Sequence, residues 1–220
     1  MIPLLHDFHG ASVLVVGGGA VGARKARRFA AEADRVVVVS PAFGDREFGD
    51  ADRIRAAPDP DGAADWVARV DPALVVAATS DSDVNAAFAA AARDAGALVN
   101  RADVAGDRDH SGDVVVPATA GDPPVTIAVS TGGRSPALSK HLRERIDEEF
   151  AGAGGMAVLT GRIREDLRST GLSPAERRDA VRAVVRSTPV WKALRTGDAN
   201  PRVRAEAAVA RAVGDVDWST

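Results

Sequence analysis

The segment Gly17–Gly22 has the residue types and the spacing of a phosphate-binding turn. Its sequence, GGGAVG, matches the pattern G-x-G-x-x-G, in which the first glycine allows a tight turn and the second lets the backbone approach a pyrophosphate. The third glycine allows a helix to pack closely on a strand, and the amides at the start of that helix face the anion. A glycine-rich turn that binds nothing is the structural alternative. We predict a dinucleotide site with these cofactor-binding residues: Gly17, Gly19, Ala20, Val21 and Gly22.

The neighbouring segments predict the elements that would position this turn. An apolar run at 12–16 precedes the glycines, a helical pattern follows over 20–32, and a second apolar run covers 35–40. These three segments form a βαβ unit, the context in which the glycine pattern indicates nucleotide binding. The run at 73–78 predicts a third parallel strand, because a continuous apolar run indicates burial on both faces of a sheet.

Residues at the ends of two predicted strands bear on the cofactor. The second strand ends in Ser40-Pro41, where many dinucleotide-binding domains place an acid for the ribose 2′-hydroxyl. Without that acid, the pattern alone leaves NAD and NADP open. Thr79 follows the third strand at its carboxyl end, where the cofactor crevice of an open α/β sheet lies. We therefore add Ser40, Pro41 and Thr79 to the cofactor-binding residues, with Thr79 on the nicotinamide side.

The fold class predicted for the whole chain is α/β, in three parts. Further patterns predict helices at 61–70 and 83–95, strands at 98–99, 114–116 and 126–130, and a helix that Ser135 caps and that ends near 150. After the glycines at 152–155 the strand pattern ends, and 156–213 predicts three or four helices. We predict a Rossmann-type parallel-sheet domain at 1–112, a small α+β dimerisation region at 113–152 and a helical domain at 153–220.

Composition restricts the class of protein. Hydrophobic residues make up 45% and charged residues 27% of the chain, which is ordinary for a globular protein. No apolar run approaches the roughly 18 residues of a membrane span, and the first residues lack the pattern of a secretory signal. The chain has no cysteine, which excludes disulfides, thiolate metal sites and cysteine nucleophiles. We expect a cytoplasmic protein that binds neither membrane nor nucleic acid.

Charge is distributed unevenly along the chain. Residues 151–220 carry a net charge of +4, whereas residues 1–150 carry −7. The basic part either meets an anionic partner or has ordinary solvated helix faces.

Four segments together resemble one family: 13–25 (VLVVGGGAVGARK), 74–85 (LVVAATSDSDVN), 99–103 (VNRAD) and 127–145 (IAVSTGGRSPALSKHLRER). Their order and spacing are similar to the precorrin-2 dehydrogenase/sirohydrochlorin ferrochelatase family, the N-terminal module of sirohaem synthase, over about residues 3–150. The resemblance implies NAD as cofactor and oxidation of precorrin-2 to sirohydrochlorin. Some members of the family also insert Fe²⁺ as a second substrate. The resemblance further implies a homodimer.

The resemblance places the family's catalytic carboxylate at Asp103. The family pattern is close to Val-Asn-Val-Val-Asp, and here Arg101 and Ala102 replace its apolar pair. Oxidation of precorrin-2 releases a proton beside the hydride, so a base is required, and iron insertion also removes protons. A turn-capping role is the alternative for Asp103.

The substrate of this family carries eight carboxylates, so cationic and amide donors should surround it. A glycine-rich turn at a helix N-terminus favours anions, and an arginine in it can form a bidentate clamp. The predicted substrate-binding residues are Arg101, Thr131, Gly132, Gly133, Arg134 and Ser135. Capping of the helix by Ser135 is compatible with that role. His110 has no second ligand at metal-binding spacing, so we predict no metal site.

Two other functions remain open from the sequence. One is a regulatory domain that senses NAD(H) without catalysis, and the other is a ligand-binding or chelatase-only protein with an idle nucleotide site. Asp103 and the segment IAVSTGGRSPALS argue against the sensor, because a sensor needs no base.

Overall fold

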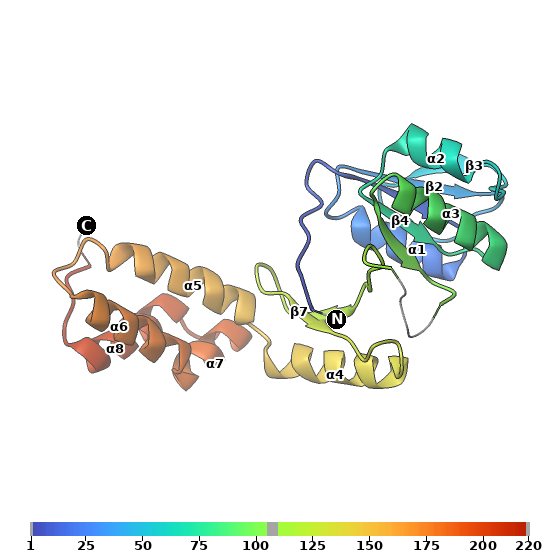
Figure 1. Ribbon diagram of the computed structural model, residues 1–220. Helices are drawn as coiled ribbons and strands as arrows, with labels where there is room; N and C mark the ends of the chain where they lie inside the picture. The colour runs from blue at the N-terminus through green and yellow to red at the C-terminus, as the bar shows by residue number, and fades with distance from the viewer. Residues whose placement is uncertain (1, 105–109, 219–220) are drawn as a thin grey trace. The chain divides into compact units, whose positions relative to one another are not determined.

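The computed structural model of the protein describes residues 2–104 and 110–218. The chain forms two compact units (Figure 1). The first runs to Val116 and also includes Gly132–Arg134, whereas the second consists of Pro117–Thr131 and the chain from Ser135 onward.

The first unit is a five-stranded parallel sheet between helices. Its elements are β1 (Ser12–Val16), α1 (Ala20–Phe29), β2 (Arg35–Ser40), β3 (Asp52–Arg55), α2 (Ala63–Val70), β4 (Leu74–Ala77), α3 (Ser82–Asp94) and β5 (Leu98–Arg101). The strand order is β3-β2-β1-β4-β5, and every pair is parallel. This confirms the predicted Rossmann-type sheet. The order reverses between β1 and β4, which is where such sheets bind their ligands.

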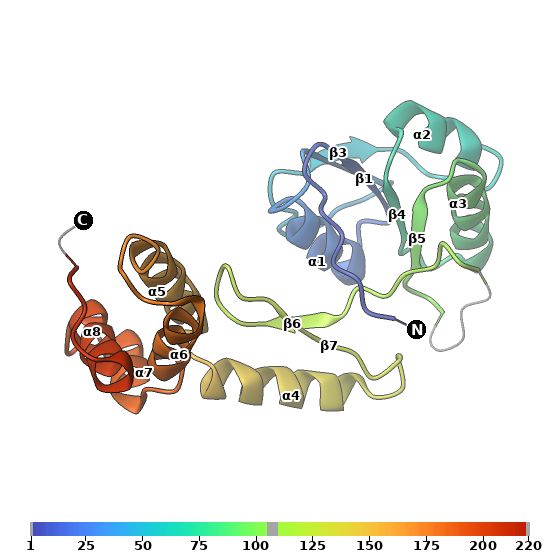
Figure 2. The ribbon, with the colours of Figure 1, turned by 60° about the vertical axis from the view of Figure 1, so that its left-hand side comes forward.

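Burial on both faces of the sheet explains its valine-rich strands. In β1, Val13 and Val15 pack with residues of α1, whereas Leu14 and Val16 pack with residues of α2 and α3. Figure 2 shows these helices on the two sides of the strands. Each fully buried side chain of this size stabilises the fold by about 1.5–3 kcal/mol. The sheet is therefore a rigid support for the loops at its carboxyl edge.

Three strands differ from the sequence-based prediction, among them β6 (Ala118–Ala120), where no strand was predicted. Residues 114–116 do not form a strand, since only an isolated bridge joins Val99 to Asp113. Arg93 holds Asp113 through a hydrogen bond of 2.8 Å from Nη2 to Oδ1 and so fixes the chain across the sheet edge. The edge strand β3 was not predicted, because in its sequence DRIR only Ile54 packs against the core.

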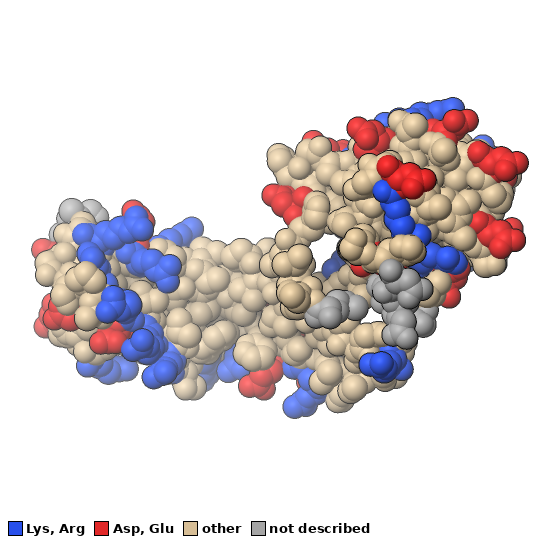
Figure 3. Space-filling model, in the orientation of Figure 1, with Lys and Arg blue, Asp and Glu red and all other residues tan. Residues whose placement is uncertain are grey.

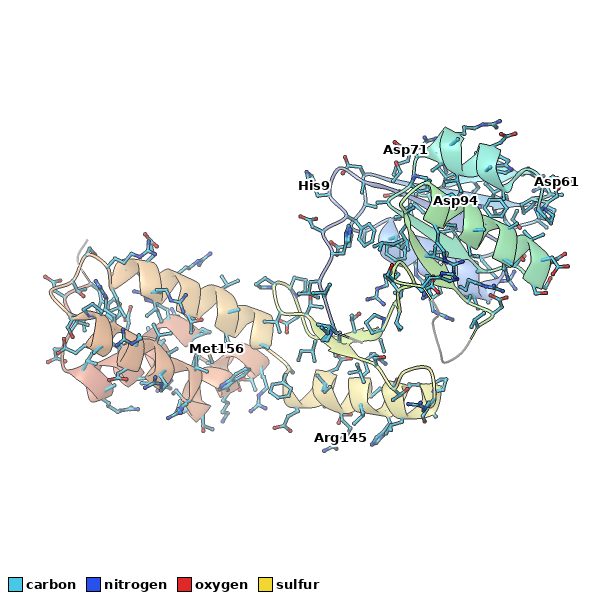
Figure 4. The ribbon with its side chains drawn as sticks, viewed as in Figure 1. His9, Asp61, Asp71, Asp94, Arg145 and Met156 are labelled. Carbon is cyan, nitrogen blue, oxygen red and sulfur yellow. The ribbon has the colours of Figure 1, made fainter. Side chains whose placement is uncertain are left out.

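The second unit combines a small sheet with helices. Its elements are β6 (Ala118–Ala120), β7 (Ile127–Val129), α4 (Pro136–Glu149), α5 (Ala153–Asp166), α6 (Pro174–Val185), α7 (Thr188–Thr196) and α8 (Pro201–Val213). Strands β6 and β7 pair antiparallel, and α4 packs along them (Figure 2). Helices α5–α8 enclose a core that includes Ile163, Val184 and Met156. Figure 4 labels Met156. Within residues 2–104 and 110–218, no helix is long and apolar enough to cross a membrane.

Candidate functional site

The glycine turn joins β1 to α1 in a conformation that requires three of its glycines. A Cβ atom on Gly18 would overlap the carbonyl oxygen of Ala42. Gly17 has a φ of +115°, and a Cβ atom on it would lie 2.5 Å from the carbonyl oxygen of Ala78 at the end of β4. A Cβ atom on Gly22 would overlap the carbonyl oxygen of Gly17. Gly17 and Gly22 therefore bring α1 close to the ends of β1 and β4, as the predicted pattern requires.

Gly19 has no such packing role. It is the N-cap of α1, with a φ of −72° that any residue adopts, and a Cβ atom on it would meet no heavy atom within 4 Å. It makes no side-chain cap, so the amides of the first turn, at Ala20 and Val21, face outward with the positive end of the helix dipole. A side chain at Gly19 would fill the space in front of these amides. Because residue 19 is glycine, that space stays open and fits a pyrophosphate.

Ser40 and Pro41 lie beside this turn at the end of β2. Ser40 is buried, and its hydroxyl donates a hydrogen bond of 2.8 Å to the carbonyl oxygen of Ala42. A Cβ atom on Gly18 would lie 2.8 Å from the Ser40 hydroxyl oxygen, so the two segments are in contact. Pro41 is exposed next to them.

The fully buried side chain of Asn85, in α3, organises the end of β4. Its Oδ1 atom accepts hydrogen bonds from the backbone amide of Thr79 at 3.0 Å and from the Thr79 hydroxyl at 2.8 Å. Its Nδ2 atom donates to the Thr79 carbonyl oxygen at 3.1 Å. Asp81 caps α3 by accepting from the amides of Asp83 and Val84. Thr79 is therefore fixed at the carboxyl edge of the sheet.

Asp103 forms a bidentate ion pair with Arg101. The distances are 3.1 Å from Nε to Oδ1 and 2.6 Å from Nη2 to Oδ2, and each side chain is about a quarter exposed. The hydrogen bond from Arg101, and a further one from Asn85, hold the pKa of Asp103 below its usual value, although partial burial acts in the opposite direction. Asp103 is therefore a carboxylate at neutral pH.

Sequence analysis did not predict this pair or the role of Asn85. Arg101 is predicted to bind substrate, and the structure shows it paired with the expected base. The available signal was the spacing, because residues two apart in an extended chain point to the same side. For Asn85 the signal was a lone amide in the otherwise alanine-rich sequence of α3.

The turn before α4 combines two left-handed glycines with a capped helix. Gly132 and Gly133 have φ values of +63° and +80°. Ser135 caps α4, since its hydroxyl accepts from the amide of Leu138 at 3.3 Å, as predicted. The Thr131 hydroxyl accepts from the Ser135 amide at 3.2 Å and so closes the turn.

Arg134 projects from this turn and is exposed. Gly132–Arg134 belong to the first unit, with Asp103 and the glycine turn, whereas Thr131 and Ser135 belong to the second. No carboxylate of the described residues pairs with Arg134, so its guanidinium is free to bind an anion.

The histidines do not gather into a site. His9, labelled in Figure 4, precedes β1 and so lies at the amino edge of the sheet, away from the glycine turn. His110 is exposed and follows residues 105–109, which lie outside the described part of the chain. Among the residues described, no group of three or more histidine, aspartate or glutamate side chains is placed to hold a metal ion.

Comparison with known proteins gives matches along the chain. Residues 4–118 match the family model "Putative NAD(P)-binding", and residues 122–149 match the model "Sirohaem biosynthesis protein central". Precorrin-2 dehydrogenase of Methanosarcina barkeri is 32% identical over 200 residues, which cover 86% of this chain and 85% of that protein. Siroheme synthase 2 of Aeromonas hydrophila is 34% identical over 178 residues, 80% of this chain but only 36% of that protein. The chain thus spans little more than a third of the length of such synthases.

A solved structure of the precorrin-2 dehydrogenase SirC has the same fold. The TM-score is 0.64 at 20% sequence identity, with 94% of this chain and 98% of that chain covered. The sheet order and the glycine turn define a dinucleotide-binding protein of the Rossmann type. More narrowly, the chain belongs to the family of precorrin-2 dehydrogenases and sirohaem synthases.

Proposed function

We propose that this chain oxidises precorrin-2 to sirohydrochlorin with NAD⁺ as the oxidant. The observation that carries the proposal is the ionised carboxylate of Asp103, fixed by Arg101 just after β5. Because the strands are parallel, their carboxyl ends share one edge of the sheet, so Asp103 and the glycine turn lie at the same edge. A sensor of NAD(H) has no use for a base held in this way.

The reaction removes a hydride and a proton from the tetrapyrrole. Bound NAD⁺ supplies the acceptor for the hydride. Asp103, ionised at neutral pH, takes the proton, and its pair with Arg101 fixes its position while lowering its pKa and hence its strength as a base. The amides of Ala20 and Val21, just after Gly19, bind the pyrophosphate, and Thr79 borders the nicotinamide. We place the reaction in the cytoplasm.

Cationic groups of the first unit bind the substrate carboxylates in this proposal. Arg134 is exposed and is not paired with a described carboxylate. Gly132 and Gly133 have no side chains, so a substrate carboxylate can approach Arg134 closely. Arg101 uses two of its five N–H donors on Asp103, so it can hold a substrate carboxylate with the others. Thr131 and Ser135 support the turn from the start of α4.

The experiment is a turnover assay with the purified chain. We expect precorrin-2 to give sirohydrochlorin only with NAD⁺ present, and the isosteric variant Asp103→Asn to bind NAD⁺ normally but to lose turnover. Tight NAD(H) binding without turnover in the wild type would favour the regulatory function instead. Fe²⁺ added to the product then tests for chelatase activity by the same chain.

We also propose that the chain is a homodimer that associates through α4. None of the residues of α4 is buried, and Leu138, Leu142 and Phe150 are 47%, 39% and 45% exposed. Together with Ile146 they are spaced four residues apart, so they form one apolar stripe. A two-stranded sheet such as β6–β7 is marginally stable alone. A second copy of this region would cover the stripe symmetrically, and sedimentation equilibrium measures the dimer.

A further inference from the structure

Five arginines surround one hollow on the second unit. The hollow has a volume of about 410 Å³ and lies between the end of α5 and α6. The arginines are Arg164, Arg168, Arg177, Arg178 and Arg182. Pro174 and Val181 also line it, and Val181 packs against the helical core. Figure 3 shows blue side chains gathered over this part of the helical unit.

The four acidic side chains of this stretch compensate only two of these arginines. Glu165 pairs with Arg168 at 3.0 Å, and Asp179 pairs with Arg182 at 2.8 Å. These two pairs compensate two of the five arginines of the hollow. A third acid, Asp166, binds Arg202 of α8 instead.

Glu176 is used by the cap of α6, where it accepts a hydrogen bond of 2.8 Å from the amide of Ser173. Within residues 2–104 and 110–218, no carboxylate pairs with Arg164, Arg177 or Arg178. The hollow therefore has about three uncompensated positive charges.

This clustering has no structural role that would explain it. Arg164 and Arg178 are exposed, and Arg177 is only partly buried, so none of them supports the core. Like charges one helical turn apart destabilise a helix by a few tenths of a kcal/mol per pair. A polyanion in the hollow would remove this repulsion and could accept bidentate hydrogen bonds from several guanidinium groups.

We propose that this hollow binds a polycarboxylate built on an apolar frame, the class to which the tetrapyrrole belongs. The identity of the ligand rests on the function proposed above. A volume near 410 Å³ lies in the lower part of the usual range for ligand sites, so the hollow takes one edge of a large macrocycle. Pro174 and Val181 contact the hydrocarbon of that edge while the arginines bind its carboxylates.

The shape and the lining argue against single-stranded nucleic acid as the occupant. Proteins that bind such strands stack the bases on aromatic side chains along an extended groove. Here the lining has no aromatic residue, and the arginines surround a single hollow. The residues that line the hollow all belong to the second unit, whereas Asp103 belongs to the first.

The test uses uroporphyrin, a stable porphyrin with eight carboxylates, titrated into the full chain and followed by its absorbance. The triple variant Arg164→Gln, Arg177→Gln, Arg178→Gln should bind it at least about tenfold more weakly. The control Arg195→Gln, Arg204→Gln, Arg211→Gln removes the same charge from exposed positions outside the hollow and should change affinity less than about twofold. Hydrogen exchange should show porphyrin-dependent protection of α6 in the wild type.

The outcomes separate this site from the enzyme function. Equal losses in the two triple variants, or no protection of α6, would reject the hollow as a site. Tighter binding of tripolyphosphate or of an oligonucleotide than of uroporphyrin would assign it to phosphates instead. Turnover of precorrin-2 by the wild type is measured independently. If the wild type shows no turnover but binds uroporphyrin through the arginines of the hollow, the proposed reaction is refuted and the proposed site is not.

Discussion

Replacing Gly19 by aspartate should separate cofactor binding from folding. The φ of −72° at Gly19 suits any residue, and its Cβ atom would meet no heavy atom within 4 Å. Aspartate is moreover a better N-cap than glycine by a few tenths of a kcal/mol, and its charge suits the positive end of α1. We therefore expect the free energy of unfolding of Gly19→Asp to equal or slightly exceed that of the wild type.

The same substitution should weaken NAD⁺ binding strongly. Two unit charges 4 Å apart repel by about 1 kcal/mol in water and about 4 kcal/mol at an effective dielectric constant of 20. Gly19 is exposed, so an intermediate value of about 2 kcal/mol applies to a carboxylate beside the pyrophosphate. At 1.4 kcal/mol per factor of ten, this is a roughly thirtyfold loss of affinity.

Calorimetric titration with NAD⁺ and urea unfolding measure the two effects on the same samples. Gly19→Asn is the matched control, because it has the same size without the charge and should lose less affinity. Gly22→Ala is the control for the reverse effect. Its Cβ atom would overlap the carbonyl oxygen of Gly17, so the substitution should lower the free energy of unfolding. A folded Gly19→Asp protein with NAD⁺ affinity within about twofold of the wild type would refute the pyrophosphate site.

Four further variants test the rest of the site. Arg101→Val removes the main cause of the low pKa of Asp103, so that pKa should rise and the acid limb of the kcat/KM profile should move to higher pH; an unchanged profile would separate Asp103 from catalysis. Asn85→Ala should lower the free energy of unfolding in urea by about 1–3 kcal/mol, because the partly buried amide of Thr79 loses its partner. Asp103→Asn should abolish turnover at every pH while leaving NAD⁺ affinity within about twofold, as titration and assay together would show. Leu142→Asp should convert the dimer to a monomer in sedimentation equilibrium, and a persistent dimer would place the interface elsewhere.

The predictable part of the fold was the part in which one pattern dominates. The valine runs of β1 and β2 have no alternative to burial on both faces, and the glycine turn between β1 and α1 then determines how α1 packs. β3 was missed because an edge strand with one buried side chain lacks that pattern. The apolar residues at 114–116 were assigned to a strand because their composition is strand-like, whereas Asp113 is held by Arg93 across the sheet edge.

The sequence predicts where the candidate site residues lie along the chain, but not which side chains contact one another. Thr79 was placed by the strand that precedes it, since the carboxyl ends of parallel strands meet at one edge. Asp103 was placed by the resemblance to the family pattern. The pairing of Arg101 with Asp103 depends on side-chain geometry, and a sequence does not determine whether an arginine binds a substrate or a neighbour. Asn85 binds Thr79, six residues earlier, through side-chain hydrogen bonds, and its lone amide in the alanine-rich α3 does not specify that partner.

The path of the chain means that no single cut divides it into its two units. Gly132–Arg134 belong to the first unit, although the residues on either side of them belong to the second. A fragment that ends at Val116 would keep the glycine turn and Asp103 but lose Arg134, and a fragment that starts at Pro117 would carry Arg134 away from both. Recombination with other proteins can therefore exchange this module as a whole more readily than it can exchange the nucleotide-binding half alone.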